Sequence, residues 1–256
     1  MEKVGFVGAF DKTDLLIYIA KILTVLGKRV LIADATITQK AKYVVPALNP
    51  TLSYITEFEE IDIAVGFKNI EGIAEYTNRT VDTLEYDYIL LDIDNAESAM
   101  NFGIDKAVQN FFVTSFDTYD IRRGLEILNE FPTPIKMTKI LFSKEVTKED
   151  DDYLNYLSLG SKVMWEDDRI YFPLEMGDKT AIIDNQKVSK VRFENLTSMY
   201  KDGMEFVVAK IDPKLQGPTV RKIMKEKLEK DTPLENKKEL DKEENKDNTL
   251  ETKTEV

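Results

Sequence analysis

The sequence contains no cysteine and no histidine among its 256 residues. Their absence excludes disulfides, cysteine nucleophiles, Ser-His-Asp triads, histidine bases and zinc sites built on Cys or His. A functional site in this chain must therefore be made from carboxylates, lysines, arginines, hydroxyl groups and backbone amides.

Positive charge is also scarce, since 35 basic residues against 47 acidic ones give a net charge of −12. This balance argues against a protein that coats DNA through its general electrostatic field, and we do not expect nonspecific DNA binding. The longest apolar region, Leu15 to Leu26, is interrupted by Lys21 and is too short to span a bilayer. The first ten residues lack the small-residue cleavage site of a signal peptide, so we expect a cytoplasmic protein.

Hydrophobic residues make up 43% of the chain, enough for a sizeable core. We expect one α/β domain over residues 1–212 and an amphipathic helix over 213–230. The last segment, 231–256, has nine acidic and five basic residues and no aromatic residue. Such a segment cannot bury enough apolar surface to offset its ordering entropy, and we expect a disordered charged tail.

Short apolar segments alternate with segments of helical spacing along the body. This pattern predicts a doubly wound, mainly parallel sheet with helices on both faces. Ligands in such folds bind at the carboxyl ends of the strands. The expected strands are residues 3–8, 29–33, 88–93, 111–114, 139–142 and 169–173, and the expected helices are 12–26, 96–108, 118–131, 179–183 and 195–208.

The segment after the first strand has the composition of a phosphate-binding loop. Such a loop needs glycine for close approach of backbone amides, a lysine for the phosphates and a hydroxyl for magnesium. Gly8, Lys12 and Thr13 stand at those spacings. The candidate nucleotide contacts are therefore Gly8, Asp11, Lys12, Thr13 and Asp14. The alternative is an ordinary turn and helix start.

Two aspartates end neighbouring apolar strands, Asp34 after the second and Asp92 near the end of the third. In P-loop proteins an aspartate in such a position orients magnesium and its waters. Thr13, Asp34 and Asp92 are therefore the candidate metal ligands. Each aspartate could instead cap the loop or helix that follows it.

Taken together, these segments resemble the ParA/MinD family of P-loop ATPases, the deviant Walker A group. The family has KGGVGKTT after its first strand, followed by GKRVLLVD and YDYIIID. The matching pieces here are VGAFDKTD, LGKRVLIAD (Leu26–Asp34), YDYILLD (Tyr86–Asp92), FFVTSFDTYDIRRGLEIL (Phe111–Leu128) and FPLE (Phe172–Glu175). The resemblance covers about residues 1–210 and implies the P-loop NTPase fold, with ATP or ADP and Mg²⁺ as cofactors.

This sequence departs from the family pattern at residues that matter for catalysis. The signature lysine, which in the family reaches the partner's nucleotide across a dimer, falls on Val7. The second glycine is Ala9, and the glycine before the conserved lysine is Asp11. The second aspartate of the family's D-x-D falls on Thr36. The resemblance therefore implies a member with an eroded site and weak or absent hydrolysis.

Three functions remain open from the sequence. The first is a positioning or assembly factor that acts through protein partners, in the manner of the TadZ/CpaE branch that places pilus or secretion machinery. The second is a working ATPase in plasmid or chromosome partition or in septum-site placement. Either could form a homodimer. Because valine stands at position 7 in place of the family's signature lysine, that dimer need not depend on ATP. The third is a dinucleotide-binding oxidoreductase, which the absence of G-x-G-x-x-G after the first strand disfavours.

Two further segments have a structural explanation that we prefer. Thr219–Lys230 places Val220, Ile223, Met224 and Leu228 on one helical face among basic residues. This narrow stripe lacks Trp and Phe, so we expect it to pack on the body or on a partner rather than on a membrane. The acidic run Glu149–Asp152 suits the first turn of a helix better than a metal site.

Overall fold

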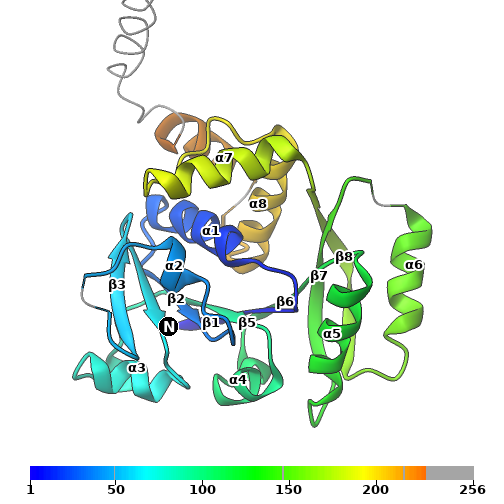
Figure 1. Ribbon diagram of the computed structural model, residues 1–256, viewed down its shortest axis with the longest axis horizontal. Coiled ribbons are helices and arrows are strands. Elements are labelled where there is room, and N and C mark those ends of the chain that lie inside the picture. Colours follow the sequence, from blue (N-terminus) through cyan, green and yellow to red (C-terminus); the bar gives the residue numbers. More distant parts are fainter. Residues whose placement is uncertain (49, 146, 216, 229–256) are drawn as a thin grey trace, which may run out of the picture.

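The computed structural model describes residues 1–48, 50–145, 147–215 and 217–228. Eight strands form one sheet in the order β3-β4-β2-β5-β1-β6-β7-β8, in which β3 alone runs antiparallel to its neighbour (Figure 1). The strands are β1 (Glu2–Val7), β2 (Val30–Asp34), β3 (Tyr54–Phe58), β4 (Ile61–Val65), β5 (Tyr88–Ile93), β6 (Gln109–Ser115), β7 (Ile135–Ser143) and β8 (Val163–Pro173). The predicted mainly parallel α/β sheet is therefore confirmed.

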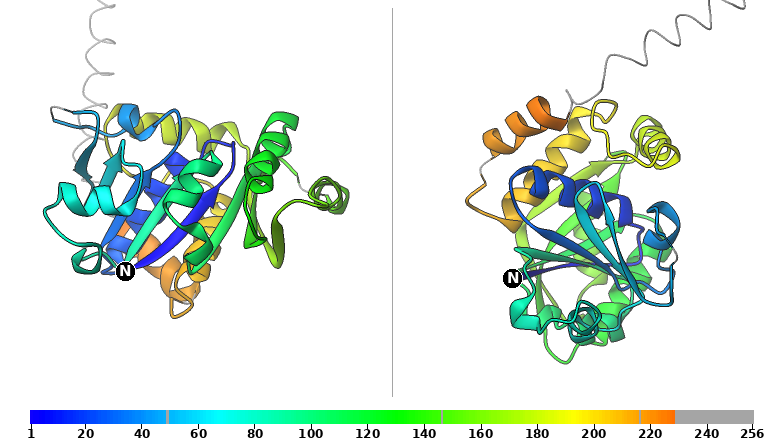
Figure 2. Two further views of the ribbon diagram at one scale, coloured as in Figure 1. Left: turned by 90° about the horizontal axis from the view of Figure 1, so that it is seen from below. Right: turned by 90° about the vertical axis from the view of Figure 1, so that its left-hand side faces the viewer.

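Helices cover both faces of this sheet, and each covered face has its own apolar core (Figures 1 and 2). One face carries α1 (Thr13–Val25), α2 (Ala41–Val44), α7 (Met176–Lys187), α8 (Ser198–Ile211) and α9 (Gly217–Ile223), which continues as a π-helical turn over Met224–Leu228. The other face carries α3 (Ile70–Tyr76), α4 (Ala96–Asn101), α5 (Thr118–Asn129) and α6 (Lys148–Leu157). Short 3₁₀ turns lie at Val81–Thr83 and Ile104–Lys106.

The antiparallel hairpin β3–β4 is absent from the sequence-based prediction. Its turn consists of Glu59 and Glu60, which both have positive φ (53° and 67°). Gly or Asn is usual at such positions and is the sequence signal by which a hairpin is predicted. Lys21 on α1 compensates, because its ammonium donates to the Glu59 carbonyl at 3.0 Å and to the Glu60 carboxylate at 3.3 Å. A tertiary contact thus supports a turn that local sequence does not predict.

The helix expected over residues 96–108 is wrong in its second half. α4 ends at Asn101, and Gly103 adopts the left-handed conformation with φ +63°. This conformation ends helices, and a 3₁₀ turn then leads into β6. The helix expected over 179–183 is longer than predicted and runs from Met176 to Lys187.

The C-terminal apolar stripe is buried on the body in the described part of the chain. Val220, Met224 and Leu228 belong to the same core as α8 and are at most 9% exposed. An apolar face in this position is not available to a lipid surface. Residues 229 and 230 of the expected helix and the expected tail lie outside the described residues. No helix of the described residues is long and apolar enough to cross a membrane.

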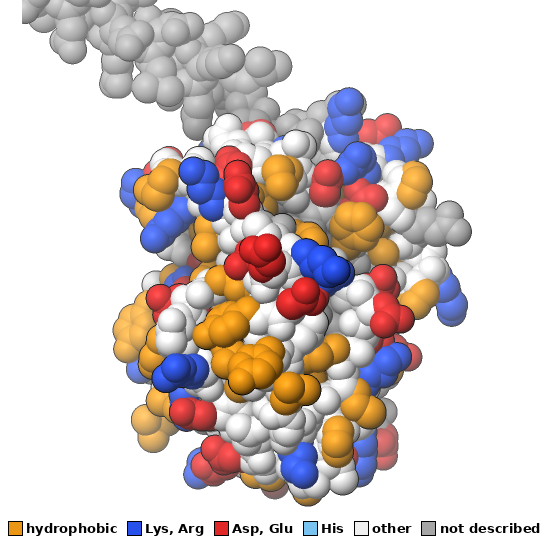
Figure 3. Space-filling view, turned by 90° about the vertical axis from the view of Figure 1, so that its right-hand side faces the viewer, with side chains coloured by type: hydrophobic (Ala, Val, Ile, Leu, Met, Phe, Trp, Pro, Cys, Tyr) orange, Lys and Arg blue, Asp and Glu red, His pale blue; other side chains and the backbone are white. Residues whose placement is uncertain are grey.

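α6 lies at one end of the molecule and is attached to the sheet by a buried ion cluster. Asp151, 5% exposed, pairs with Lys139 of β7 at 2.8 Å and also with Arg169 of β8. Hydrophobic side chains gather on the outer side of this end of the molecule (Figure 3). On α6, Tyr153 and Tyr156 are 50% and 69% exposed. The acidic run therefore begins a helix, as expected, and also supplies one buried carboxylate.

We predict that Asp151→Ala lowers the free energy of unfolding by about 3–5 kcal/mol, because it leaves Lys139 buried without its countercharge. Urea denaturation at pH 7 measures this loss. Asp152→Ala, at the exposed neighbouring position, is the matched control and should stay within about 0.5 kcal/mol of the parent. Equal effects of the two substitutions would contradict the role of the cluster.

Glu166 of β8 forms a second polar cluster, at the amino-terminal edge of the parallel strands. Its carboxylate pairs with the ammonium groups of Lys136 at 2.8 Å and Lys210 at 3.4 Å, and it accepts a hydrogen bond from the Thr138 hydroxyl. Burial raises the pKa of Glu166, but the bonds from Lys136 and Thr138 and the charge of Lys210 outweigh it and lower the pKa to about 2. The carboxylate form therefore stabilises the fold.

Because this folded-state pKa lies below the ordinary value of 4.5, the stabilisation is present above pH 4.5 and is lost as the pH falls toward 2. We predict that Glu166→Gln lowers stability at pH 7 and that the difference from the parent shrinks between pH 4.5 and 2. Denaturation curves over this range test it, with exposed Asp167→Asn as the control. A difference that does not change with pH would contradict the prediction.

Candidate functional site

The candidate loop joins β1 to α1 at the carboxyl edge of the sheet. Gly8 begins it with φ +150°, and a Cβ at this position would lie 2.0 Å from the carbonyl oxygen of Val113 on β6. Only glycine fits such a close approach to a neighbouring strand. The first glycine of the predicted phosphate loop is thus required by the packing of β1 against β6.

Lys12 and Asp92 form a buried ion pair behind this loop. The Lys12 ammonium lies 2.9 Å from Asp92 Oδ1, and each side chain is 2% exposed. The same ammonium donates to the Gly8 carbonyl at 3.0 Å. Lys12 therefore ties the first residue of the loop to the end of β5.

Thr13 completes this group. Its hydroxyl donates to Asp92 Oδ2 at 3.0 Å, and the side chain is buried. The structure thus brings together three of the predicted residues, Lys12, Thr13 and Asp92. At the start of α1, Asp92 Oδ2 accepts a hydrogen bond from Thr13, and Oδ1 has the Lys12 ammonium beside it as an ion-pair partner but accepts no hydrogen bond within the described residues.

Asp11 places its carboxylate at the amino terminus of α1. Its Oδ1 accepts a hydrogen bond from the backbone N–H of Thr13 at 3.2 Å, and its Oδ2 lies 2.5 Å from the ammonium of Lys40. Backbone donors at a helix amino terminus are the groups that bind phosphate in a phosphate loop. Here one of them is already satisfied by a carboxylate of the chain itself.

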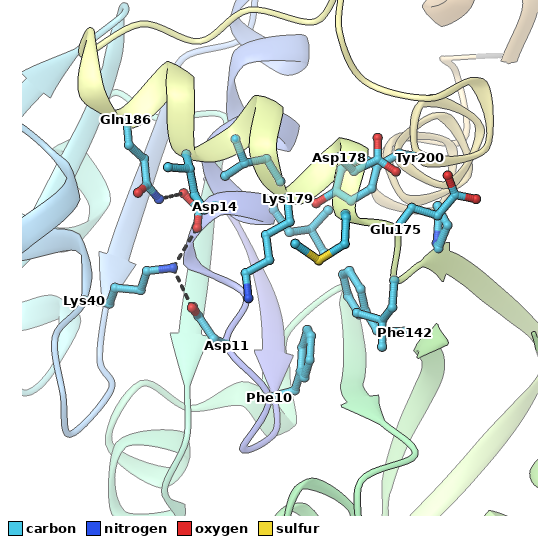
Figure 4. A pocket seen from close by; sticks show the side chains of 16 residues that line it. Phe10, Asp11, Asp14, Lys40, Phe142, Glu175, Asp178, Lys179, Gln186 and Tyr200 are labelled. Atoms are coloured by element: carbon cyan, nitrogen blue, oxygen red, sulfur yellow. Dashed lines mark hydrogen bonds and ion pairs between the residues drawn. The ribbon is translucent and has the colours of Figure 1, made fainter. Parts of the chain in front are cut away.

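Lys40, in the loop between β2 and α2, binds the carboxylates at the start of α1. Besides Asp11, its ammonium binds Asp14 Oδ2 at 2.7 Å, and the other oxygen of Asp14 accepts from Gln186 of α7 at 2.6 Å (Figure 4). We call the set Asp11, Asp14, Lys40 and Gln186 the latch. It links three segments that are far apart in the sequence.

Asp34 lies beside Asp92, since the two residues are register partners on β2 and β5. Its oxygens accept from the Thr36 hydroxyl at 2.6 Å and from the Ala41 amide at 2.9 Å. Burial raises the pKa of Asp34 to about 6, and the negative charge of Asp92 adds to the rise. Asp34 therefore accepts its hydrogen bonds from the loop that follows it, and not from Lys12 or Thr13.

The fold family implies Mg²⁺ and a nucleotide, and the donor types for both are present. Their present bonds do not fit either group. Asp92 Oδ2 accepts from Thr13, Asp92 Oδ1 pairs with the Lys12 ammonium without accepting a hydrogen bond, and Asp34 accepts from Thr36 and Ala41. Within the described ranges, no group of three or more Asp and Glu residues could hold a metal ion.

Sequence reasoning missed Lys40, Gln186 and Asp94. Asp94 Oδ1 accepts from the backbone N–H of Ile37 at 2.9 Å and from the Asn95 amide at 3.0 Å, which anchors the loop that carries Lys40. A carboxylate two residues after Asp92 is a signal that could have pointed to this anchor. Lys40 and Gln186 carry no local signal, because their role depends on the path of the loop and of α7.

We predict that Lys40→Ala destabilises the protein by about 1 kcal/mol or less, because the ion pairs it removes are partly exposed. The larger effect should be local, with faster amide hydrogen exchange over residues 36–41. Lys42→Ala is the control, since this neighbouring lysine forms no ion pair with the described residues. Unchanged exchange in the Lys40 variant would show that the latch does not hold the loop.

No model of a known protein family matches this sequence, and no curated protein matches it either. Solved structures do match the fold. The MinC:MinD cell division complex of Aquifex aeolicus aligns with a TM-score of 0.51 at 15% identity, over 88% of this chain and 96% of that one. The cell division ATPase MinD of Pyrococcus furiosus aligns with a TM-score of 0.52 at 13% identity, over 83% of this chain and 98% of that one. A putative plasmid partition protein of Borrelia burgdorferi bound to AMPPNP aligns with a TM-score of 0.50 at 9% identity, over 88% of this chain and 99% of that one. The chain thus has the fold of the MinD and ParA ATPases.

Proposed function

We propose that this chain is a degenerate ParA/MinD-like protein that acts as a positioning or assembly factor through protein partners, with weak or no ATP hydrolysis. The observation that carries the proposal is the Asp11 carboxylate on the Thr13 amide, paired with Lys40. This carboxylate takes the place that a nucleotide phosphate would need at the start of α1.

Two energies oppose a nucleotide at the start of α1, the loss of the Lys40–Asp11 ion pair and the repulsion from the Asp11 charge. Breaking the partly exposed pair between Lys40 and Asp11 costs at most about 1 kcal/mol, so the pair alone would not keep a nucleotide out. A carboxylate about 4 Å from a phosphate costs a further 1–4 kcal/mol or so, depending on the local dielectric. The charge of Asp11 is therefore the main obstacle to a polyphosphate.

Two other positions support weak or absent turnover. Val7, where the family has its signature lysine, is fully buried in β1 and has no group that could reach a partner's nucleotide. Thr36, where the family has a second aspartate, turns its hydroxyl onto Asp34 at 2.6 Å. Neither position offers a group that could activate a water molecule.

The role in positioning comes from the proteins that share the fold, which include cell division and plasmid partition proteins. We extend that role to this chain as part of the proposal, with the TadZ/CpaE branch of pilus and secretion machinery as the nearest type. The net charge of −12 favours protein partners over nonspecific DNA. In this proposal the protein is cytoplasmic, and a homodimer need not depend on ATP.

One observation favours a second function, an active ATPase in partition or septum-site placement. Lys12 and Thr13 do converge on Asp92 near the ends of β1 and β5, with polar atoms 2.9 and 3.0 Å from its carboxylate oxygens. If nucleotide displaced the Asp11 carboxylate, Gly8, Lys12, Thr13 and Asp14 would be its contacts, and Thr13, Asp34 and Asp92 would face its magnesium. The two functions differ in one measurable property, which is turnover.

The test compares ATP turnover and calorimetric ATP binding, with and without magnesium, in the parent, Asp11→Gly, Asp11→Asn and Lys12→Ala. We expect no turnover in the parent and no binding below millimolar ATP. Asp11→Gly should tighten ATP binding between about five- and a thousandfold, because 1–4 kcal/mol of repulsion is removed. Asp11→Asn is the matched control that removes the charge and keeps the side-chain size.

Robust magnesium-dependent turnover in the parent that disappears in Lys12→Ala would overturn the proposal and establish the second function. Equal ATP affinity in the parent and in both Asp11 variants would show that Asp11 does not exclude the nucleotide.

A further inference from the structure

The outer face of α6 presents large apolar side chains to solvent. Tyr153, Tyr156 and Leu159 are 50%, 69% and 75% exposed. The two tyrosines are three residues apart on the helix, and Leu159 follows at the same interval, with its amide bonded to the Tyr156 carbonyl. Residues at this spacing are neighbours on one side of a helix, so the three side chains form a row about 9 Å long. We call this row the α6 stripe.

α6 is fixed to the body at both of its ends. At its start the Thr147 hydroxyl and the Asp150 carboxylate form a capping box. At its end the Trp165 indole N–H donates to the Ser158 hydroxyl at 2.9 Å, and on the inner side Leu154 is fully buried. The exposed side chains of the stripe are therefore held in place before any partner arrives, which lowers the entropic cost of binding.

The charge next to the stripe is mainly negative. Glu149 and Asp152 are exposed, and each precedes a tyrosine of the stripe by four residues, which is about one helical turn. Neither carboxylate forms an ion pair or a hydrogen bond through its side chain with the described residues. Lys148 is the one cation of α6, so the exposed side of the helix keeps an excess of carboxylates.

These charges select among the molecules that could cover the stripe. A second copy of this chain brings the same carboxylates and a net charge of −12, and an anionic lipid surface is repelled for the same reason. An amphipathic helix with apolar residues at i, i+3, i+4 and i+7 matches the length and shape of the stripe. Lysines or arginines on the flank of such a helix would face Glu149 and Asp152. Tyrosine is also among the residues that contribute most to binding at protein interfaces.

We propose that the outer face of α6 binds a basic amphipathic helix of a partner protein, with the apolar side of that helix on the α6 stripe and its basic flank on Glu149 and Asp152. The inference rests on the proposed function, because it names the chemistry of the protein partner through which such a factor acts. No residue of α6 belongs to the latch or to the group of Lys12, Thr13 and Asp92, so this surface is separate from the candidate nucleotide site.

The experiment selects phage-displayed random peptides of about 16 residues, or about four helical turns, on the whole chain. Soluble protein with Tyr153→Ala and Tyr156→Ala is the competitor, so that peptides bound to other surfaces are removed. We expect selected peptides with helical apolar spacing and an excess of Lys and Arg. In calorimetry Tyr156→Ala should weaken their binding roughly tenfold, because an exposed aromatic anchor is lost. Glu149→Lys should weaken it severalfold at low salt and less at high salt.

Two substitutions elsewhere are the matched controls. Phe206→Ala removes an aromatic side chain of α8 that is 62% exposed, and Glu97→Lys reverses an exposed charge in the first turn of α4, the helical position that Glu149 has in α6. Both should bind the peptides as the parent does, and urea denaturation checks that all variants are folded.

Three results would overturn the inference. These are a selection that yields no peptide or only peptides without excess basic residues, equal weakening in the Tyr156 and Phe206 variants, and a dimer of the parent that Tyr156→Ala dissociates, which would make a second copy the occupant. Turnover of ATP is measured separately and no step of the selection uses nucleotide, so failure of this inference and failure of the proposed function are distinguishable.

Discussion

The arrangement of the site depends on one buried carboxylate, Asp92. It is 1% exposed and meets both the Lys12 ammonium and the Thr13 hydroxyl, so its negative charge is compensated by the first turn of α1. Removing either partner would leave a charge or polar atom without compensation in a region that water does not reach. This requirement fixes the start of α1 against the end of β5, and the direction in which Asp11 extends follows from it.

Each cation of the loop is paired within the chain, with two lysines facing three carboxylates. Lys12 is matched by Asp92, and Lys40 is matched by Asp11 and Asp14. A phosphate loop that awaits its ligand keeps donors and cations unsatisfied until the anion arrives. Here the Asp11 carboxylate occupies the place of the bound anion, because it accepts from the Thr13 amide and pairs with Lys40.

How far the sequence predicts this structure depends on whether the information is local. The central strands were predictable because continuous Val, Ile and Leu runs mark strands buried on both faces. Asp34 and Asp92 were predicted to lie near Thr13 because parallel strands end at one edge. The hairpin β3–β4 was not predictable, since Lys21 supports a Glu59–Glu60 turn from another element. Lys40 and Gln186 were missed for the same reason, because only the folded chain brings them to Asp14.

The register shift in β8 has a consequence for association between molecules. Between Met137 and Lys139 of β7, the opposite strand inserts Glu166, Asp167 and Asp168 against a single residue. β8 is an edge of the sheet, and a flat apolar edge is a template for pairing with another chain. Three consecutive carboxylates on a bulged segment interrupt that template, so a strand arriving from a second molecule would meet bent backbone and negative charge. The geometry that gives Glu166 its lysine partners thereby also keeps the open end of the sheet from growing.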